Sequence, residues 1–435
     1  MAKLPPKRIS NSLMNALRGG VVPREGAEYI AVGRTDELEA ILHDIEILEE
    51  GGSTFRFIVG EFGSGKSFLF SIIRSHVTKK GFIVLDADLA PNRKLTGSKN
   101  EGLNLYRELI KNMSTQSCPN GGALSLILDK WISNFNLEAR ANKISEEDKR
   151  EYILDRIYES CSTMRDMVHG FEFGKLLENY YISYEEGDSE RKDNVLKWLR
   201  GEYNLKRDAK KDLGISIIIT DNDWYDYIKL ITSFSVQAGY KGVLMLCDEM
   251  INLSKISNKT ARQNNFEKLL MLYNDTLQGK AHNLGIIMGA TPRSLEDDRR
   301  GVFSYEALRS RLDKGSFASN EMKDLLSPIL TIKKLNDSEL FVLLERLSEL
   351  HASLFGKNTI QENDIKQFLT SELSRVGAAE KLTPREIIRD FIEVMNLLLQ
   401  NPDSSVESIL NNKGFSYTKS LQEDSIDDEF TTFVV

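Results

Sequence analysis

The stretch Gly60-Glu-Phe-Gly-Ser-Gly-Lys-Ser67 decides how this chain folds. It follows a short apolar run, Phe55–Val59, and opens a helical pattern that carries Leu69, Ile72 and Ile73 on one side. Its spacing matches G-x-x-x-x-G-K-[S/T], and the order strand, glycine-rich turn, helix is that of a phosphate-binding loop. An ordinary glycine-rich turn is the alternative, and the flanking strand and helix disfavour it.

Each residue type in this loop suits a polyphosphate. Gly63 and Gly65 allow the backbone to wrap closely around an anion, and the helix N-terminus adds positive partial charge. Lys66 would neutralise the β- and γ-phosphates, and Ser67 would ligate Mg²⁺. The predicted nucleotide-binding residues of the loop are Gly60, Gly63, Ser64, Gly65, Lys66, Ser67 and Phe68.

An acidic pair ends another apolar run, Val243–Cys247. A buried strand that ends in a carboxylate would bring Asp248 to the magnesium ion beside Ser67, and Glu249 would polarise the attacking water. Two acids that merely cap a strand are the alternative. Because no Asn-Lys-x-Asp motif for reading guanine is found, the pair favours hydrolysis of ATP over a GTP switch.

Polar residues further along the chain are candidates for contacts with the γ-phosphate. Thr291 follows an apolar run and could hold the lytic water, although it could equally cap the turn before Pro292. Arg311, and second to it Arg309, could reach the γ-phosphate of a neighbouring subunit as an arginine finger. Arg385 could reach the nucleotide from a C-terminal helical domain. The alternative is a solvated helix face for Arg311 and Arg309, and an exposed position in the first turn of a helix for Arg385.

The apolar runs are short, bounded by turns and apolar on both faces, which is typical of buried parallel strands. They alternate with helical patterns, so the chain is predicted to be α/β with a parallel five-stranded sheet. Helical periodicity also fills the long interval between the second and third runs, which we interpret as an insertion. The runs are Phe55–Val59, Phe82–Leu85, Val243–Cys247, Ile286–Met288 and Ile329–Ile332.

Two helix-start signals indicate a small helical lid behind the sheet. Asn336-Asp-Ser-Glu339 precedes leucines at helical spacing, and Thr383-Pro-Arg-Glu386 supplies an N-cap, a proline at N1 and a glutamate at N3. The predicted divisions are a basic N-terminal segment (1–30), the first part of the nucleotide-binding core (31–95), a mostly helical insertion (96–238), the second part of the core (239–335), the lid (336–402) and an acidic tail (403–435).

Composition excludes several classes of protein. Hydrophobic residues make up 41% and charged residues 28%, which rules out wholesale disorder. No apolar run approaches the ~20 residues of a membrane span, and three unpaired cysteines fit a reduced cytoplasm without a disulfide framework or zinc site. The net charge of −8 argues against a uniformly basic nucleic-acid binder, but residues 1–24 hold five basic groups and no acid.

Together these residues resemble an AAA+ ATPase of the initiator or STAND-like kind. The resemblance includes Val32-Gly-Arg-Thr-Asp-Glu37 upstream of the loop. In such proteins a Gly-Arg-x-x-Glu segment lies against the adenine. The resemblance therefore implies that Gly33 and Arg34 bind the base.

A closer resemblance is to the BREX-system ATP-binding family, the BrxC/BrxD-like P-loop proteins of bacterial phage defence, and within it to the BrxD type. It implies a cytoplasmic ATPase that uses ATP and Mg²⁺ and acts with other BREX proteins, often a helicase-like one, on foreign DNA. Nuclease, methylase and helicase motifs are absent. The segments that carry the resemblance are Val21–Gly26, Phe55–Ser67, Asp86–Leu89, Trp198–Tyr203, Asp223–Tyr227, Gly301–Leu308 and Leu382–Asp390.

Two basic stretches are candidates for DNA contact. Lys3–Arg24 has no offsetting acid, whereas Arg200–Lys211 has interleaved acids that usually mark a solvated face. Trp224, Tyr225 and Tyr227 could stack on bases, although core packing is the commoner role of such a cluster.

Three functions remain open from the sequence. The first is a homo-oligomeric ATPase that assembles on DNA and remodels or loads a partner. The second is a STAND-like switch that nucleotide holds off until a phage signal releases it. The third is a scaffold that binds ATP without appreciable hydrolysis.

Overall fold

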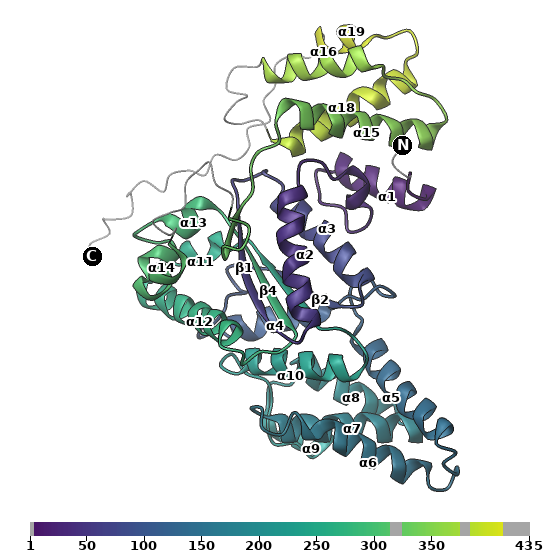
Figure 1. Ribbon diagram of the computed structural model, residues 1–435, viewed down its shortest axis with the longest axis vertical. Coiled ribbons are helices and arrows are strands. Elements are labelled where there is room, and N and C mark those ends of the chain that lie inside the picture. The colour runs from purple at the N-terminus through teal and green to yellow at the C-terminus, as the bar shows by residue number, and fades with distance from the viewer. Residues whose placement is uncertain (1–3, 314–323, 375–382, 412–435) are drawn as a thin grey trace, which may run out of the picture.

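A parallel five-stranded sheet forms the centre of the protein, with strand order β2-β3-β4-β1-β5 (Figure 1). The computed structural model describes residues 4–313, 324–374 and 383–411. Each strand coincides with one of the apolar runs, so the predicted α/β class with a parallel sheet is confirmed. The strands are β1 (Thr54–Val59), β2 (Ile83–Asp88), β3 (Val243–Asp248), β4 (Leu284–Ala290) and β5 (Ile329–Thr331).

The register of the strands brings their carboxyl ends to one edge of the sheet. Val59 at the end of β1 aligns with Ala290 of β4 and with Thr331 of β5, and Asp88 of β2 aligns with Asp248 of β3. Ligands of open parallel sheets bind at this edge. The glycine-rich turn after β1 and the acidic pair at the end of β3 therefore lie at the same edge of the sheet.

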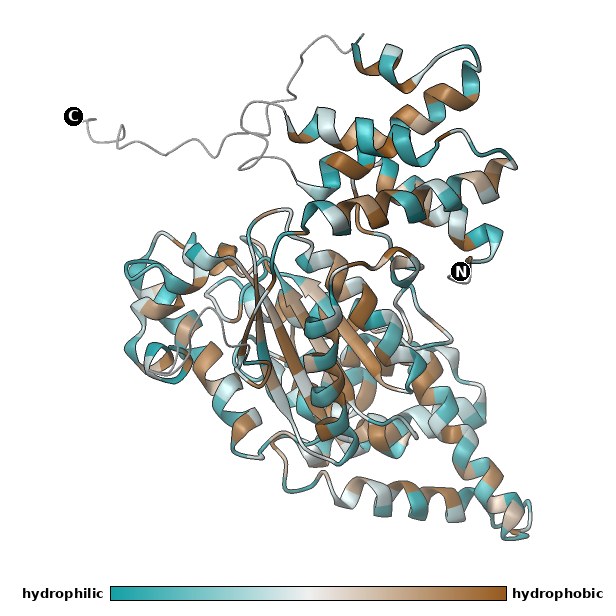
Figure 2. Cartoon of the chain, turned by 45° about the horizontal axis from the view of Figure 1, so that its top comes forward, coloured by the Kyte–Doolittle hydropathy of each residue, from teal (hydrophilic) through white to brown (hydrophobic). Residues whose placement is uncertain are grey.

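Both faces of the sheet are covered by helices, which explains why the strands are apolar throughout rather than alternating. Ile58, Val84 and Leu246 pack with two helices on one face, α2 (Thr35–Glu49) and α3 (Lys66–Lys79). The opposite face packs against other helices, and Figure 2 shows the strands as a hydrophobic layer between them. Those helices are α4 (Glu101–Lys111), α10 (Trp224–Gln237) and α12 (Lys259–Leu277).

The interval between β2 and β3 is helical, as predicted, and its outer part extends away from the sheet (Figure 1). Trp224, Tyr225 and Tyr227 of α10 are fully buried, so these rings pack in the core and the stacking role on bases is wrong. The outer helices are α5 (Leu124–Ala141), α6 (Lys149–Ser162), α7 (Gly170–Glu186), α8 (Ser189–Leu199) and α9 (Lys206–Leu213).

Both predicted helix starts behind the sheet are confirmed. Asn336 and Thr383 are N-caps with complete capping boxes, and Pro384 occupies the first turn of its helix. Each box satisfies backbone N–H groups that the first helical turn leaves free. The helices of this region are α15 (Asp337–Phe355), α16 (Glu362–Leu373), α18 (Pro384–Gln400) and α19 (Val406–Asn411).

The N-terminal helix α1 (Lys7–Arg18) packs on the C-terminal helices, which the sequence did not predict. Leu13, Met14 and Leu17 are buried in the same core cluster as α15 and α18. The remaining elements are short: η1 (Ala27–Ile30), α11 (Ile251–Ser254), α13 (Pro292–Glu296), η2 (Val302–Ser304) and α14 (Glu306–Leu312).

Among the helices within residues 4–313, 324–374 and 383–411, none is long and apolar enough to cross a membrane. The predicted division into domains stays a prediction, and the part of the acidic tail after residue 411 lies outside the described residues.

Candidate functional site

The turn between β1 and α3 has the backbone that its glycines predict. Gly63 and Gly65 have φ angles of 74° and 99°, in the left-handed region of backbone conformation that residues with a Cβ atom rarely adopt. The amide of Gly60 donates to the carbonyl of Ala290 at 3.1 Å and so fixes the turn to the sheet edge. Lys66 then begins α3, whose free first-turn N–H groups and dipole favour an anion.

The ammonium group of Lys66 lies over this turn. Its Nζ donates to the carbonyl oxygens of Gly60 at 2.7 Å and Glu61 at 3.1 Å. Partial burial lowers the pKa of Lys66, while the carboxylates of Asp248 and Glu249 oppose that shift. Phosphate oxygens are stronger acceptors for a cation than neutral carbonyl oxygens. The Lys66 ammonium group could therefore exchange these carbonyls for the oxygens of a bound phosphate.

Ser67, in the first turn of α3, contacts Asp248 at the end of β3, although β3 and the strand that precedes the loop, β1, are not neighbours in the sheet. Ser67 Oγ donates to Asp248 Oδ2 at 2.6 Å, and Asp248 is only 5% exposed at the end of β3. A hydroxyl and a carboxylate in contact form a set of oxygen ligands that Mg²⁺ accepts. The two residues therefore fit the predicted metal site.

Glu249 follows in a strained conformation. Its φ of 60° is unusual for a residue other than glycine, and such outliers cluster at functional sites. Burial, and then the charges of Asp248 and Asp88, raise the pKa of Glu249, and Lys66 opposes the shift. A carboxylate with a raised pKa is a better proton acceptor at neutral pH. The influence of Asp88 on Glu249 was not predicted. The available signal was that Asp88 ends the apolar run of β2, just as Asp248 ends that of β3.

A pocket joins this turn to two distant parts of the chain. Its polar end is formed by residues 62–68 and Glu249. Its other walls come from the N-terminal segment and from the lid, and they are mostly apolar, as a planar base requires. The apolar residues of these other walls are Leu17, Val21, Val22, Pro23, Ile30, Val32, Leu335, Leu343, Pro384 and Ile388.

The part of the wall between Leu17 and Ile30 was not predicted: residues 1–30 were expected to form a basic segment, and Val21–Gly26 was linked only to the family resemblance. The apolar run Val21-Val22-Pro23 was the available signal.

Arg34 lines the pocket, and its side chain organises the loop. It is 5% exposed, donates to the carbonyls of Ser64 at 2.7 Å and Lys333 at 3.0 Å, and pairs with Glu37 at 3.5 Å. Gly33 instead packs against the lid, because a Cβ there would crowd the Glu339 carboxylate. The predicted contact of both residues with the base stays a prediction.

The buried polar atoms of the loop provide a test of whether a triphosphate fits. The hydroxyl of Ser64 is buried and has no hydrogen-bond partner within the described ranges. An unpaired buried hydroxyl costs roughly 1–3 kcal/mol unless a ligand or water satisfies it. With the ammonium of Lys66 beside it, the loop has the donors that phosphate oxygens need.

Gly63 brings the loop into contact with the lid, since a Cβ at this position would overlap the side chain of Thr383. Gly63→Ala is expected to weaken ATP binding about tenfold, because the lid must move, and to cost ~1–2 kcal/mol of stability from the left-handed backbone. Gly122→Ala is the matched control, since Gly122 has a similar φ of 78° and open space around it. Titration calorimetry and thermal unfolding separate the effects: equal ATP affinity in both variants would contradict the lid contact.

Thr291 does not line this pocket. Its Oγ accepts from the Ser294 amide at 3.1 Å, and its own amide donates to the Ser294 hydroxyl at 2.9 Å. The residue is 5% exposed and caps α13, as the alternative from the sequence allowed. Its predicted contact with the lytic water stays a prediction.

The three candidate arginines differ in position. Arg385 is exposed and lines the pocket from the start of α18. Arg309 pairs with Asp298 at 2.9 Å, and Arg311 is exposed with a bond to the Ala307 carbonyl at 2.6 Å. Neither Arg309 nor Arg311 lines the pocket, so they do not act on a ligand bound to their own chain there.

The parallel sheet and the pocket at its carboxyl edge define an α/β protein of the P-loop nucleotide-binding class. The chain belongs to the BREX system ATP-binding protein BrxC/D family, whose sequence model matches residues 6–414. No curated protein matches the chain. The family confirms ATP as the nucleotide and the other proteins of the BREX phage-defence system as partners.

Proposed function

We propose that this chain is a magnesium-dependent ATPase of the AAA+ type and the BrxD kind. The observation that carries the proposal is the contact of Ser67 with Asp248, directly beside Glu249 and Lys66. A site built only to bind ATP needs the lysine and the loop. An acid with a raised pKa next to the metal ligands adds the group that hydrolysis needs.

The roles of the residues follow from this arrangement. Mg²⁺, held by Ser67 and Asp248, would neutralise charge that develops on the phosphates. Lys66 leaves its two carbonyl acceptors and pairs with the β- and γ-phosphates. Glu249 accepts a proton from the water that attacks the γ-phosphate.

The AAA+ assignment is supported by the lid. Helices α15 and α18 approach the loop closely enough to wall the pocket, at Leu343 and Ile388. A nucleotide between the loop and the lid would contact both at once. Binding and hydrolysis would then change the position of the lid, which is how such a protein could act on a partner.

Assembly into a homo-oligomer remains part of the proposal. The side chain of Arg311 lies clear of its own pocket and is exposed, which suits contact with a neighbouring subunit's γ-phosphate. Arg309 is less suitable because it is already paired with Asp298. We therefore retain Arg311 as the first candidate for the finger.

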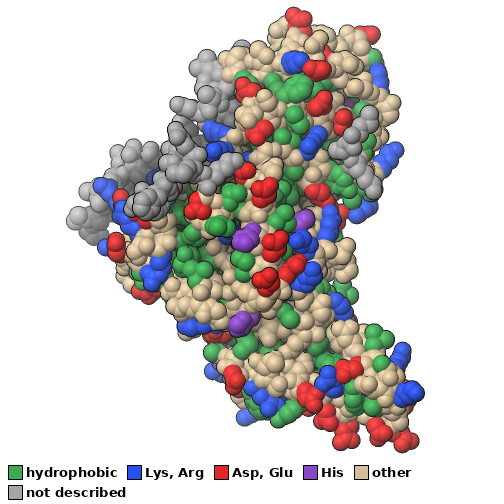
Figure 3. All heavy atoms as spheres, in the orientation of Figure 1, with side chains coloured by type: hydrophobic (Ala, Val, Ile, Leu, Met, Phe, Trp, Pro, Cys, Tyr) green, Lys and Arg blue, Asp and Glu red, His purple; other side chains and the backbone are tan. Residues whose placement is uncertain are grey.

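DNA binding is proposed for the outer face of α1. Lys7 and Arg18 are exposed, whereas Arg8 pairs with Glu25 at 3.0 Å, and Arg24, which follows the helix, donates to the Asn120 carbonyl at 3.2 Å. The far end of the insertion is unsuitable, because acidic side chains gather there (Figure 3). The exposed acids of that end include Glu146, Glu147, Glu185 and Glu186.

Helix α9 is the second basic candidate, and we use it as the matched comparison. The double variant Lys7→Gln/Arg18→Gln is expected to lower the slope of log affinity against log salt by about 2, one unit for each lost phosphate contact. Lys206→Gln/Lys211→Gln removes the same charge from exposed positions of α9 and should leave the slope unchanged. If only the α9 variant changes the slope, the DNA surface is on the insertion and not on α1.

The proposed function is tested by ATP turnover with and without DNA, together with solution mass with and without ATP. DNA-stimulated turnover that is lost in Glu249→Gln supports the ATPase. Assembly that needs ATP and a phage-derived trigger, without stimulation by DNA, would identify a STAND-like switch. ATP that co-purifies and stays intact would identify a scaffold.

A further inference from the structure

The strained conformation of Glu249 needs support from its neighbours. Its amide donates to Asp248 Oδ1 at 2.8 Å, and its carbonyl accepts the backbone amide of Asn252 at 3.0 Å. The side-chain amide of Asn252 adds a donor to the same carbonyl, with Nδ2 at 3.3 Å. Asn252 is a partly buried residue of the short helix α11, and no motif points to it.

The same Nδ2 of Asn252 also donates to the carbonyl of Leu89 at 2.8 Å, directly after β2. The Leu89 amide in turn donates to the Asp248 carbonyl at 2.9 Å. One amide group therefore joins the ends of β2 and β3 around Glu249. Both acceptors are neutral backbone carbonyls, and the donor is a neutral amide. The link therefore consists of two hydrogen bonds and involves no charged group.

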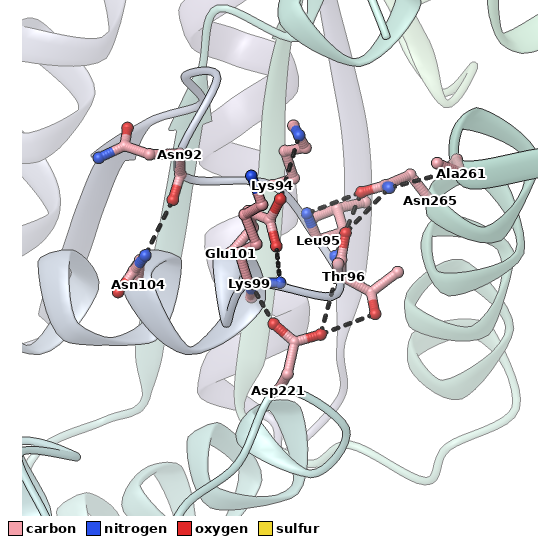
Figure 4. Close-up of polar contacts among 12 residues, drawn as sticks. Asn92, Lys94, Leu95, Thr96, Lys99, Glu101, Asn104, Asp221, Ala261 and Asn265 are labelled. Atoms are coloured by element: carbon pink, nitrogen blue, oxygen red, sulfur yellow. Dashed lines mark hydrogen bonds and ion pairs between the residues drawn. The ribbon is translucent and has the colours of Figure 1, made fainter. Parts of the chain in front are cut away.

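Further along the segment that follows β2, residues 95–97 are held by side chains of Asp221 and Asn265 (Figure 4). Asp221 accepts from the Thr96 hydroxyl at 2.8 Å and from the Gly97 amide at 2.9 Å. Asn265 accepts the amides of Leu95 and Thr96 at 3.0 and 3.1 Å. Leu89 itself is held by its amide bond to Asp248, and the next residue, Ala90, exchanges two backbone hydrogen bonds with Arg93, so the Leu89 carbonyl is a defined acceptor for Asn252.

We propose that Asn252 is a positioning residue for ATP hydrolysis, which holds Glu249 in its left-handed conformation by bridging its carbonyl to that of Leu89. The inference rests on the proposed ATPase function. Asn252 is not among the residues that line the pocket, so its loss is expected to leave nucleotide binding unchanged. Its loss allows the Glu249 carboxylate to leave the position that faces the attacking water.

The test compares Asn252→Ala with Asn104→Ala, because Asn104 donates one bond to a carbonyl of the same segment, Asn92, at 3.1 Å but lies away from Glu249. Asn252→Ala is expected to lower kcat at least about tenfold with the affinity for ATP unchanged within about twofold. Asn104→Ala should change neither quantity. Equal kcat in the two variants overturns the proposal.

A double-mutant cycle separates positioning from general destabilisation. In the Glu249→Gln background, Asn252→Ala should have no further effect on kcat, because the group that it positions is already inactive. A second full loss in that background would show that Asn252 acts elsewhere, and would overturn the inference while leaving the proposed function intact.

Hydrogen exchange provides a measurement that does not depend on turnover. Asn252→Ala should speed exchange at least about tenfold in a peptide that covers 246–253, with the loop 60–67 unchanged. Unchanged exchange in 246–253 overturns the inference even if the wild-type chain proves not to hydrolyse ATP. Absence of turnover in wild type, by contrast, contradicts only the proposed function.

Discussion

Lys66→Ala is expected to weaken ATP binding at least about a hundredfold, on the order of 3 kcal/mol. The ammonium lies on the carbonyls of Gly60 and Glu61, partly buried, with its charge directed at the turn. Removing it leaves the triphosphate without its main counter-charge from the loop. Calorimetric titration with Mg-ATP measures the change.

Lys79→Ala is the matched control for this variant. Lys79 lies at the other end of the same helix, and its exposed ammonium pairs with Glu28 at 2.8 Å. The control should bind ATP like wild type. If Lys66→Ala also binds ATP with wild-type affinity, the nucleotide site is not the turn between β1 and α3.

Glu249→Gln is expected to lower the rate of ATP hydrolysis about a thousandfold while ATP binding is retained. The amide keeps the size of the side chain but cannot accept the proton of the attacking water, and a positioned general base contributes roughly 10²–10⁴-fold. Glu39→Gln, on the exposed side of α2, is the control with the same chemical change. Full turnover by Glu249→Gln would remove Glu249 from the mechanism.

The pH dependence of hydrolysis provides a second readout for Glu249. The residue must be ionised to accept a proton, and burial with the neighbouring acids raises its pKa above the ordinary 4.5. Turnover should therefore fall as the pH drops through this raised pKa, before ordinary surface carboxylates titrate. In Glu249→Gln the residual rate should lose this acid limb.

The sheet and the helix starts could be predicted because their signals are local. A strand buried on both faces shows a short apolar run, and the capping boxes at Asn336 and Thr383 each span only a few residues. The adjacent pair Asp248-Glu249 was found for the same reason, from one strand and its end.

The walls of the pocket could not be predicted in the same way, because they depend on contacts between distant parts of the chain. Arg34 bonds to the carbonyl of Lys333, and Gly63 meets the side chain of Thr383. Neither contact follows from spacing or periodicity. The composition of the N-terminal segment indicated only its basic residues. The apolar face of α1 is buried because Leu13 and Leu17 pack against the helices of the lid.

Thr291 illustrates a limit of reasoning from strand ends. A hydroxyl at that position suits a ligand and a helix cap equally well, and only the bond from the Ser294 amide shows that the cap uses it. Asn252 is the converse case. Its role depends on two carbonyls, at Leu89 and Glu249, that come together only in the folded chain.

The central claim is that the turn between β1 and α3 holds the triphosphate, with the rest of the nucleotide between the N-terminal segment and the lid. A crystal structure of the chain with Mg²⁺ and a non-hydrolysable ATP analogue tests it most directly. We expect the γ-phosphate near Lys66 and Glu249, the metal ion on Ser67 and Asp248, and the base against Val22 and Ile388. An analogue bound elsewhere, with Lys66 still on the Gly60 carbonyl, would contradict the account.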